Sequence, residues 1–182
     1  MRIAISGAHC CGKSTLIDAF LLKHDDYIHE PEAYEALQDL HSETFAAEPS
    51  ADDFYRQLEY QIVRLQQYNV GDRIIFERSP ADYLAYLLAL VDLNRETADI
   101  ELAERSIEMV RDAITLLDII MFLPAGGSVD DSEDPQLRRV VNRLLENIIL
   151  NDEYDMFTAK RPMILEASGD TQERLRRLEQ VL

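Results

Sequence analysis

The stretch "RIAISGAHCCGKST" (residues 2–15) is an apolar run that ends at a glycine and leads into Gly-Lys-Ser-Thr. From Gly7 to Ser14 the spacing is G-x-x-x-x-G-K-[ST], that of a phosphate-binding loop. The run before it predicts a strand, and the apolar residues of 13–23 recur at helical spacing. A glycine-rich turn at a helix N-terminus presents backbone N–H groups to phosphate. We therefore expect nucleotide binding here.

The predicted nucleotide-binding residues are Gly7, Ala8, His9, Cys10, Cys11, Gly12, Lys13, Ser14 and Thr15. Lys13 supplies a mobile cation for the outer phosphates, and Ser14 a hydroxyl ligand for Mg²⁺. ATP and Mg²⁺ are therefore the expected cofactors. The adjacent Cys10 and Cys11 cannot easily both ligate one ion, and they have no C-x-x-C partner, so we interpret them as small loop residues.

Composition sets the broad class of the protein. With 182 residues, 47% of them hydrophobic, the chain predicts a single domain over residues 1–182. The 18 basic against 35 acidic residues, for a net charge of −17, argue against a nucleic-acid or membrane partner. Two adjacent cysteines and the lack of a signal-peptide pattern favour the cytoplasm, and the apolar run at 86–91 is too short to span a bilayer.

Short apolar strands alternate with helices along the chain, which predicts a parallel sheet covered on both faces. Ser50, with Asp53 three residues later, marks a helix start, and Pro80 marks another. The segment 31–40 fits either a loop or a helix. The expected strands are 2–6, 27–30, 73–77, 118–124 and 161–168, and the expected helices are 13–23, 51–69, 80–90, 96–117 and 136–150.

Three stretches carry a family resemblance: "GAHCCGKST" (7–15), "HEPEAY" (29–34) and "FERSPADYLAY" (76–86). In order and spacing they resemble the P-loop nucleoside and nucleotide kinases, most closely the deoxyribonucleoside kinases and ATP-binding domains of the nicotinamide riboside kinase type. The resemblance covers about the first half of the chain. It implies an α/β P-loop NTPase, a three-layer sandwich whose five parallel strands have the order 2-3-1-4-5. The active site is then expected at the carboxyl ends of the strands.

The resemblance also assigns roles to charged residues at two strand ends. Glu30 matches the glutamate that takes the proton of the attacking hydroxyl, and Arg78 the arginine on the acceptor or the transferring phosphate. Glu77 is placed near Mg²⁺ or the acceptor. From the residues alone, Glu30 can equally be a solvated strand end, and Glu77 with Arg78 an ordinary salt bridge. The expected catalytic residues are therefore Lys13, Glu30 and Arg78.

On the helix after Ser50, the side chains of Gln57, Gln61 and Arg64 recur at four and three residues and share one face. In deoxyribonucleoside kinases a glutamine from the corresponding helix reads the base. The resemblance thus makes these three residues and Glu77 acceptor candidates. A polar helix flank explains the same pattern.

A lid is expected around residues 124–143, where kinases of this group cover the phosphates with arginines. The candidates here are Arg138, Arg139 and Arg143, and the last two lie at i and i+4 on one helix face. The acidic run before them departs from the arginine-rich lids of deoxyribonucleoside kinases. Solvated helix charges are the alternative interpretation.

The predicted function is Mg-ATP-dependent phosphoryl transfer to a small hydroxyl-bearing acceptor, for which a nucleoside or nucleotide is a candidate. The alternative is an ATP-binding regulatory module or slow ATPase switch without an acceptor. An N-K-x-D guanine-reading motif is lacking, which disfavours a GTPase, and the length disfavours a mechanical ATPase of the AAA type. Apolar helix faces between 80 and 117 leave room for a homodimer.

Overall fold

The computed structural model describes residues 1–41, 49–126 and 134–182. Its centre is a parallel five-stranded sheet in the order β2-β3-β1-β4-β5, so the predicted fold class and strand order are confirmed. The first strand has the expected bounds, and the other four are shorter than expected by one to four residues. The strands are β1 (Arg2–Ser6), β2 (Ile28–Glu30), β3 (Ile74–Glu77), β4 (Ile119–Phe122) and β5 (Met163–Glu166).

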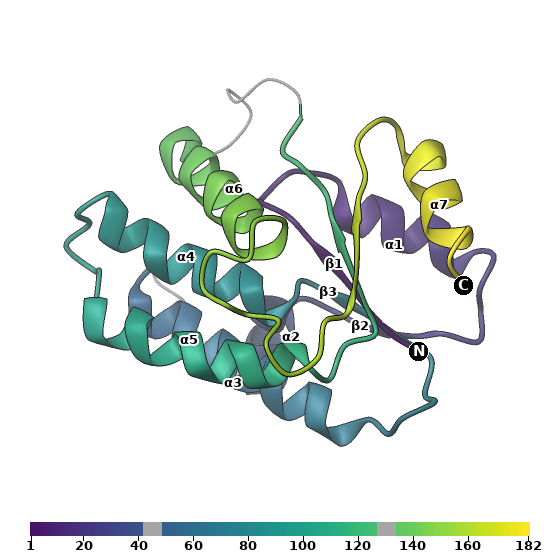
Figure 1. The fold of residues 1–182 in the computed structure, drawn as a ribbon, viewed down its shortest axis with the longest axis horizontal. Coiled ribbons are helices and arrows are strands. Elements are labelled where there is room, and N and C mark those ends of the chain that lie inside the picture. The colour runs from purple at the N-terminus through teal and green to yellow at the C-terminus, as the bar shows by residue number, and fades with distance from the viewer. Residues whose placement is uncertain (42–48, 127–133) are drawn as a thin grey trace.

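Helices cover both faces of the sheet and make the three layers seen in Figure 1. One face carries α1 (Lys13–Leu21) and α7 (Thr171–Glu179), which pack side by side. The opposite face carries α3 (Ala51–Gln67), α4 (Pro80–Asp92), α5 (Ile100–Ile114) and α6 (Pro135–Ile149). Helix α2 (Ala33–His41) follows β2 and contacts α3.

The central strand β1 is buried on both sides because its side chains alternate between two cores. Ile3 and Ile5 pack with Phe20 of α1 on one face of the sheet. Ala4 packs with the helices of the other face. This explains why the strand reads as a continuous apolar run.

Local signals set the helix starts. Ser50 and Ser79 both form capping boxes with the aspartate three residues later, as the sequence predicts for Ser50. The helix expected over 96–117 is present as α5 but is shorter at both ends. At its start, the side chain of Asp99 accepts from the Leu102 N–H (2.9 Å), so α5 begins at Ile100. The segment 31–40, for which the sequence fits either a loop or a helix, lies largely in helix α2.

Helix α4 lies in the middle of its layer, in contact with α3, α5 and α6. Ten of its residues are buried within this one chain. The α4 part of the apolar surface that favoured a homodimer is therefore covered, and self-association stays a prediction. Within residues 1–41, 49–126 and 134–182, none of the helices is both long and apolar enough to cross a membrane.

Candidate active site

The predicted phosphate-binding loop connects the end of β1 to the start of α1 at the carboxyl edge of the sheet. Gly12 caps α1 with φ +88°, a left-handed conformation that glycine adopts without strain. A Cβ added at Gly7 would lie 2.5 Å from the Cys11 Sγ and 2.7 Å from the Leu123 carbonyl oxygen. Both glycines of the motif are thus required by the local geometry.

Lys13 and Ser14 are the first two residues of helix α1, directly after this loop. The Lys13 side chain is buried, and its ammonium donates to the carbonyl of Ala8 (3.2 Å). Ser14 Oγ donates to Glu77 Oε1 (2.9 Å), which brings two predicted magnesium ligands together. Hydroxyl and carboxylate oxygens are the hard ligands that Mg²⁺ prefers. The pair fits an Mg²⁺ ion whose remaining ligands include phosphate oxygens.

Arg78 follows directly after β3 and is 3% exposed. Its guanidinium donates from Nη1 to the Gly7 carbonyl (3.2 Å) and from Nε to Glu32 Oε1 (2.6 Å). Its backbone is left-handed (φ +72°), which is strained for a residue with a side chain. Gln61 Nε2 donates to the Arg78 carbonyl (2.5 Å) and Asp82 lies 3.6 Å from Nη1, so neighbours hold this conformation.

Glu32 accepts from Arg78 and lies near Lys13 of the phosphate-binding loop. Burial alone would raise the pKa of Glu32, but the nearby Arg78 and Lys13 outweigh burial and lower it below its ordinary value. Glu32 is therefore ionised at neutral pH. Asp82 supports the same region, because its carboxylate accepts from the Gly7 N–H (2.9 Å) and from the Ser79 N–H (2.8 Å).

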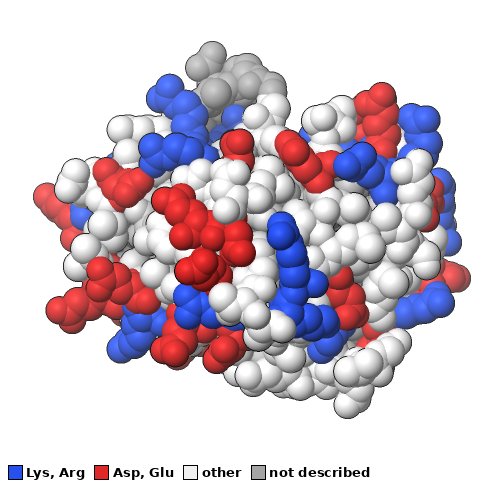
Figure 2. Space-filling model, viewed as in Figure 1, with Lys and Arg blue, Asp and Glu red and all other residues white. Residues whose placement is uncertain are grey.

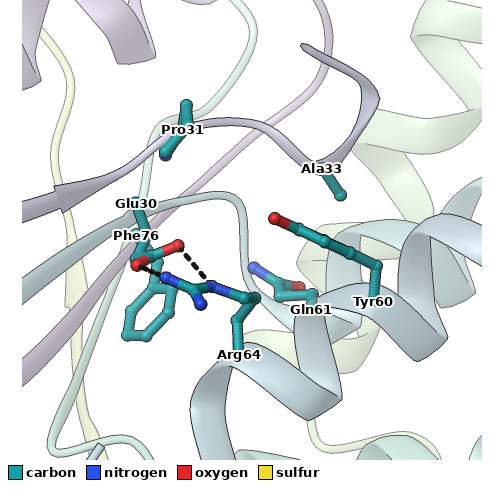
Figure 3. Close-up of a pocket in the computed structure, with 7 residues that line it drawn as sticks. All are labelled: Glu30, Pro31, Ala33, Tyr60, Gln61, Arg64 and Phe76. Carbon is teal, nitrogen blue, oxygen red and sulfur yellow. Dashed lines mark hydrogen bonds and ion pairs between the residues drawn. The ribbon is translucent and has the colours of Figure 1, made fainter. Parts of the chain in front are cut away.

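Glu30, the predicted base, ends β2 and points toward α3. Arg64 donates to both oxygens of its carboxylate, with Nε to Oε2 at 3.0 Å, and the Tyr68 hydroxyl donates to Oε1. Burial and the bond to Glu30 raise the pKa of Tyr68 to about 12. Figure 3 shows the Glu30–Arg64 pair in the wall of a hollow. The hollow is lined by Glu30, Pro31, Ala33, Tyr60, Gln61, Arg64 and Phe76.

The four acceptor candidates therefore separate. Gln61 and Arg64 line the hollow, whereas Glu77 lies at Ser14. Gln57 is buried, and its amide donates to the Asp53 carbonyl of its own helix (3.2 Å). Of the three residues predicted to share a helix face, Gln61 and Arg64 line the hollow and Gln57 does not.

The lid candidates separate in the same way, and residues 127–133 of the expected lid lie outside the described residues. Arg138 is buried and donates from Nε to the His9 carbonyl of the loop (2.9 Å). Arg139 bonds to the Pro135 carbonyl of its own helix (3.3 Å). Arg143 pairs with Asp92 of α4 (2.6 Å) at the surface. The structure therefore brings Arg138 to the loop and directs the other two elsewhere.

Glu32 and Arg174 were missed by the sequence reasoning. Glu32 stands two residues after Glu30 in the same "HEPEAY" stretch, so the motif held a signal for two candidate carboxylates. Arg174 Nη1 donates to the Cys11 carbonyl (2.7 Å) from helix α7. In the sequence it stands among other charged residues of an amphipathic helix, where a site residue looks like any solvated one.

Surface charge differs from the charge around the loop. Figure 2 shows Asp and Glu side chains spread over the viewed face, with Lys and Arg side chains between them. With a net charge of −17, a phosphate site needs positive charge close to the loop. Lys13, Arg78 and Arg138, each at most 5% exposed, provide it there.

The sheet order and the loop define a P-loop NTPase fold, which solved kinase structures share. The chain belongs to the family described as "AAA domain", whose match spans residues 2–174. This match shows the domain family and by itself assigns no activity. No curated protein matches the chain.

Solved structures with this fold include deoxyadenosine kinase from M. mycoides. With the products dCMP and dCDP it gives a TM-score of 0.64 at 18% identity, and with dATP 0.65 at 17%, each covering 100% of this chain and 98% of the kinase. NadR protein in complex with NAD and AMP-PNP gives 0.69 at 12%, covering 98% of this chain and 48% of NadR. At these identities the likeness shows the fold.

Proposed function

We propose that the protein transfers a phosphoryl group from Mg-ATP to the hydroxyl of a small acceptor, with a nucleoside or nucleotide as the first candidate. One chain of contacts carries this proposal. Gln61 lines the hollow and donates to the Arg78 carbonyl, while the Arg78 side chain donates to the Gly7 carbonyl of the loop. Two sites separated by one buried arginine fit a reaction between two bound molecules.

The phosphate side would act mainly through charge. The loop N–H groups and Lys13 would bind the phosphates, and Arg78 would stabilise charge that develops during transfer. Ser14 and Glu77 would hold Mg²⁺, which neutralises phosphate charge when bound. These assignments rest on the 2.9 Å contact between Ser14 and Glu77 and on the burial of the two cations.

For the base, the resemblance implies Glu30, but the contacts favour Glu32. Arg64 bonds both oxygens of Glu30, whereas Arg78 bonds one oxygen of Glu32 (2.6 Å), which also lies near Lys13 of the loop. The acceptor oxygen would bond to the γ-phosphorus while its proton passes to Glu32. The bond from that phosphorus to the bridging oxygen then breaks, and its electron pair leaves with ADP. Glu30 would instead fix Arg64 in the wall of the hollow.

The hollow limits the acceptor. Its empty volume is about 190 Å³, including the open space at its mouth. The enclosed part of the hollow is therefore smaller than this volume. The wall around the Glu30–Arg64 pair would move when an acceptor binds.

The remaining features of the proposal follow from composition. We infer that residues 1–182 act as one unit. We also infer a location in the cytoplasm, because the exposed Cys10 and the buried Cys11 are both free thiols. Its partner is a small molecule, with no role for nucleic acid or membrane in view of the acidic charge.

The test is acceptor-dependent release of ADP. The protein would be incubated with Mg-ATP and, in turn, 2′-deoxyadenosine, 2′-deoxycytidine and nicotinamide riboside, after a thermal-shift screen of a wider nucleoside set. A ligand at a hundred times its Kd stabilises by about 2.7 kcal/mol, which such a screen detects. A kinase releases ADP faster with one acceptor. A rate of ADP release that stays the same with every acceptor favours the regulatory module or slow ATPase switch.

A further inference from the structure

Five consecutive carbonyls of the phosphate-binding loop, from Gly7 to Cys11, each accept a hydrogen bond from a cationic side chain. The donors come from four parts of the chain. The contacts are Arg78 Nη1 to Gly7 O (3.2 Å), Lys13 Nζ to Ala8 O (3.2 Å), Arg138 Nε to His9 O (2.9 Å), Arg138 Nη2 to Cys10 O (3.5 Å) and Arg174 Nη1 to Cys11 O (2.7 Å).

These contacts fix the direction of the loop amides. A carbonyl and the N–H of the next residue share one planar peptide group and point in opposite directions. Where Arg138 and Arg174 hold the carbonyls of residues 9–11, the N–H groups of residues 10–12 are turned away from these arginines. Converging N–H groups form an anion-binding concavity. The cationic contacts therefore favour the conformation that receives phosphate.

Two of the donors approach from opposite faces of the sheet. Arg138 lies on α6, whose apolar residues join the core of α3, α4 and α5. Arg174 lies on α7, which packs on α1 through Leu175 and Leu178. Both helices are anchored in a core, so both guanidinium groups are held in place.

Arg174 lies very close to the loop. A Cβ added at Gly12 would lie 3.1 Å from its Nη1, and its Nε is buried without a hydrogen-bond partner among the described residues. Its neighbours on α7 are different: Arg176 bonds to the Gln172 carbonyl of the same helix, and Arg177 is exposed. Of the three arginines of α7, Arg174 is therefore the one that bonds to the loop.

We propose that Arg174 and Arg138 are positioning residues that hold the loop carbonyls outward and so prepare the loop amides for the phosphates of ATP. The inference rests on the nucleotide-binding part of the proposed function and is independent of any acceptor. Hydrogen bonds to charged groups are the stronger class, and preorganised donors bind without a reorganisation cost.

The experiment compares Mg-ATP affinity, by calorimetry, with the melting temperature of the ligand-free protein. Arg174→Ala should weaken ATP binding roughly tenfold, the loss of one charge-assisted bond, with little change in melting temperature. Arg174→Lys keeps a cation and should recover part of the affinity. The matched control Arg177→Ala should bind ATP like the parent.

A second pair of variants tests the other face of the sheet. Arg138→Ala should weaken ATP binding, and its neighbour Arg139→Ala should not. Unchanged affinity in Arg174→Ala overturns the proposal. The proposal is also overturned if Arg174→Ala loses affinity in proportion to a fall in melting temperature and Arg174→Lys does not restore it. That result would mean that Arg174 has a purely structural role. If the parent does not bind Mg-ATP, nucleotide binding itself fails; a protein that binds ATP but phosphorylates no acceptor leaves this proposal standing.

Discussion

The two sides of the candidate active site are built differently. The phosphate side is a stretch of backbone whose carbonyls are held by cations from four parts of the chain. The acceptor side is a set of side chains, and its main charged groups, Glu30 and Arg64, are bonded to each other. One side presents backbone donors to a ligand, and the other presents a wall whose charges are already paired.

This difference indicates where specificity would lie. Backbone amides bind phosphate whatever side chains the loop carries, which explains how His9 and Cys10 can stand at variable positions of the motif. Side chains that form the hollow decide which acceptor fits. A change on the phosphate side should therefore affect every nucleotide-dependent property, and a change on the acceptor side should affect transfer alone.

The largest expected effect separates the two glutamates. Glu32→Gln keeps the size of the side chain but removes its basicity, so kcat should fall by a factor on the order of 100 to 10,000. Mg-ATP affinity should change far less than kcat, because a glutamine at position 32 can still accept a hydrogen bond from Arg78 Nε. Steady-state kinetics with the best acceptor, alongside ATP titration, measure both quantities.

Glu30→Gln is the matched control for this variant. It should lower kcat far less than Glu32→Gln and act mainly on the KM of the acceptor, since Glu30 holds Arg64. The opposite ranking of the two variants would make Glu30 the base, as the resemblance implies.

A smaller loss is expected from Lys13→Ala, on the phosphate side. Removal of the buried ammonium should reduce kcat/KM for ATP by a factor on the order of 100 to 1,000, similar to the loss of one preorganised donor in other active sites. The fold should persist. His9→Ala serves as the control, because the loop uses the His9 carbonyl and keeps it in that variant. Equal ATP turnover in Lys13→Ala and the parent would contradict the assignment of the loop.

The smallest effect concerns stability. A methyl group at Gly7 would meet the Leu123 backbone oxygen, which cannot rotate away as a side chain can. We expect Gly7→Ala to destabilise the protein by about 1–3 kcal/mol, the usual cost of overpacking. At Gly126 an added Cβ meets no atom of the described residues within 4 Å, so Gly126→Ala should stay within about 0.5 kcal/mol of the parent. Denaturant melts of the two variants decide whether the loop needs this close approach.

The fold and the loop between β1 and α1 could be predicted because their signals are local. Strand β1, the loop and α1 lie within residues 2–21, and the capping box at Ser50 spans four residues. Such patterns depend on spacing along the chain, which the sequence states directly. The helix predicted at 96–117 exists, but its start was placed too early because the Asp99 cap was overlooked.

The acceptor side could be predicted only in part. The helical repeat placed Gln61 and Arg64 on one face, but it could not show that Arg64 bonds to Glu30 across 34 positions. Arg174 acts 163 positions away from Cys11 and leaves no trace in local spacing. Contacts of this kind depend on how the helices pack on the sheet, and sequence periodicity does not contain that information.

The most direct test of the central claim is whether a phosphoryl group reaches an acceptor. The parent protein would be incubated with Mg²⁺ and γ-³²P-labelled ATP together with each acceptor from the screen, and the products separated by chromatography. The account predicts a labelled acceptor phosphate that forms in step with ADP and is nearly lost in Glu32→Gln. Label that appears only as inorganic phosphate, at a rate that no acceptor changes, would contradict it.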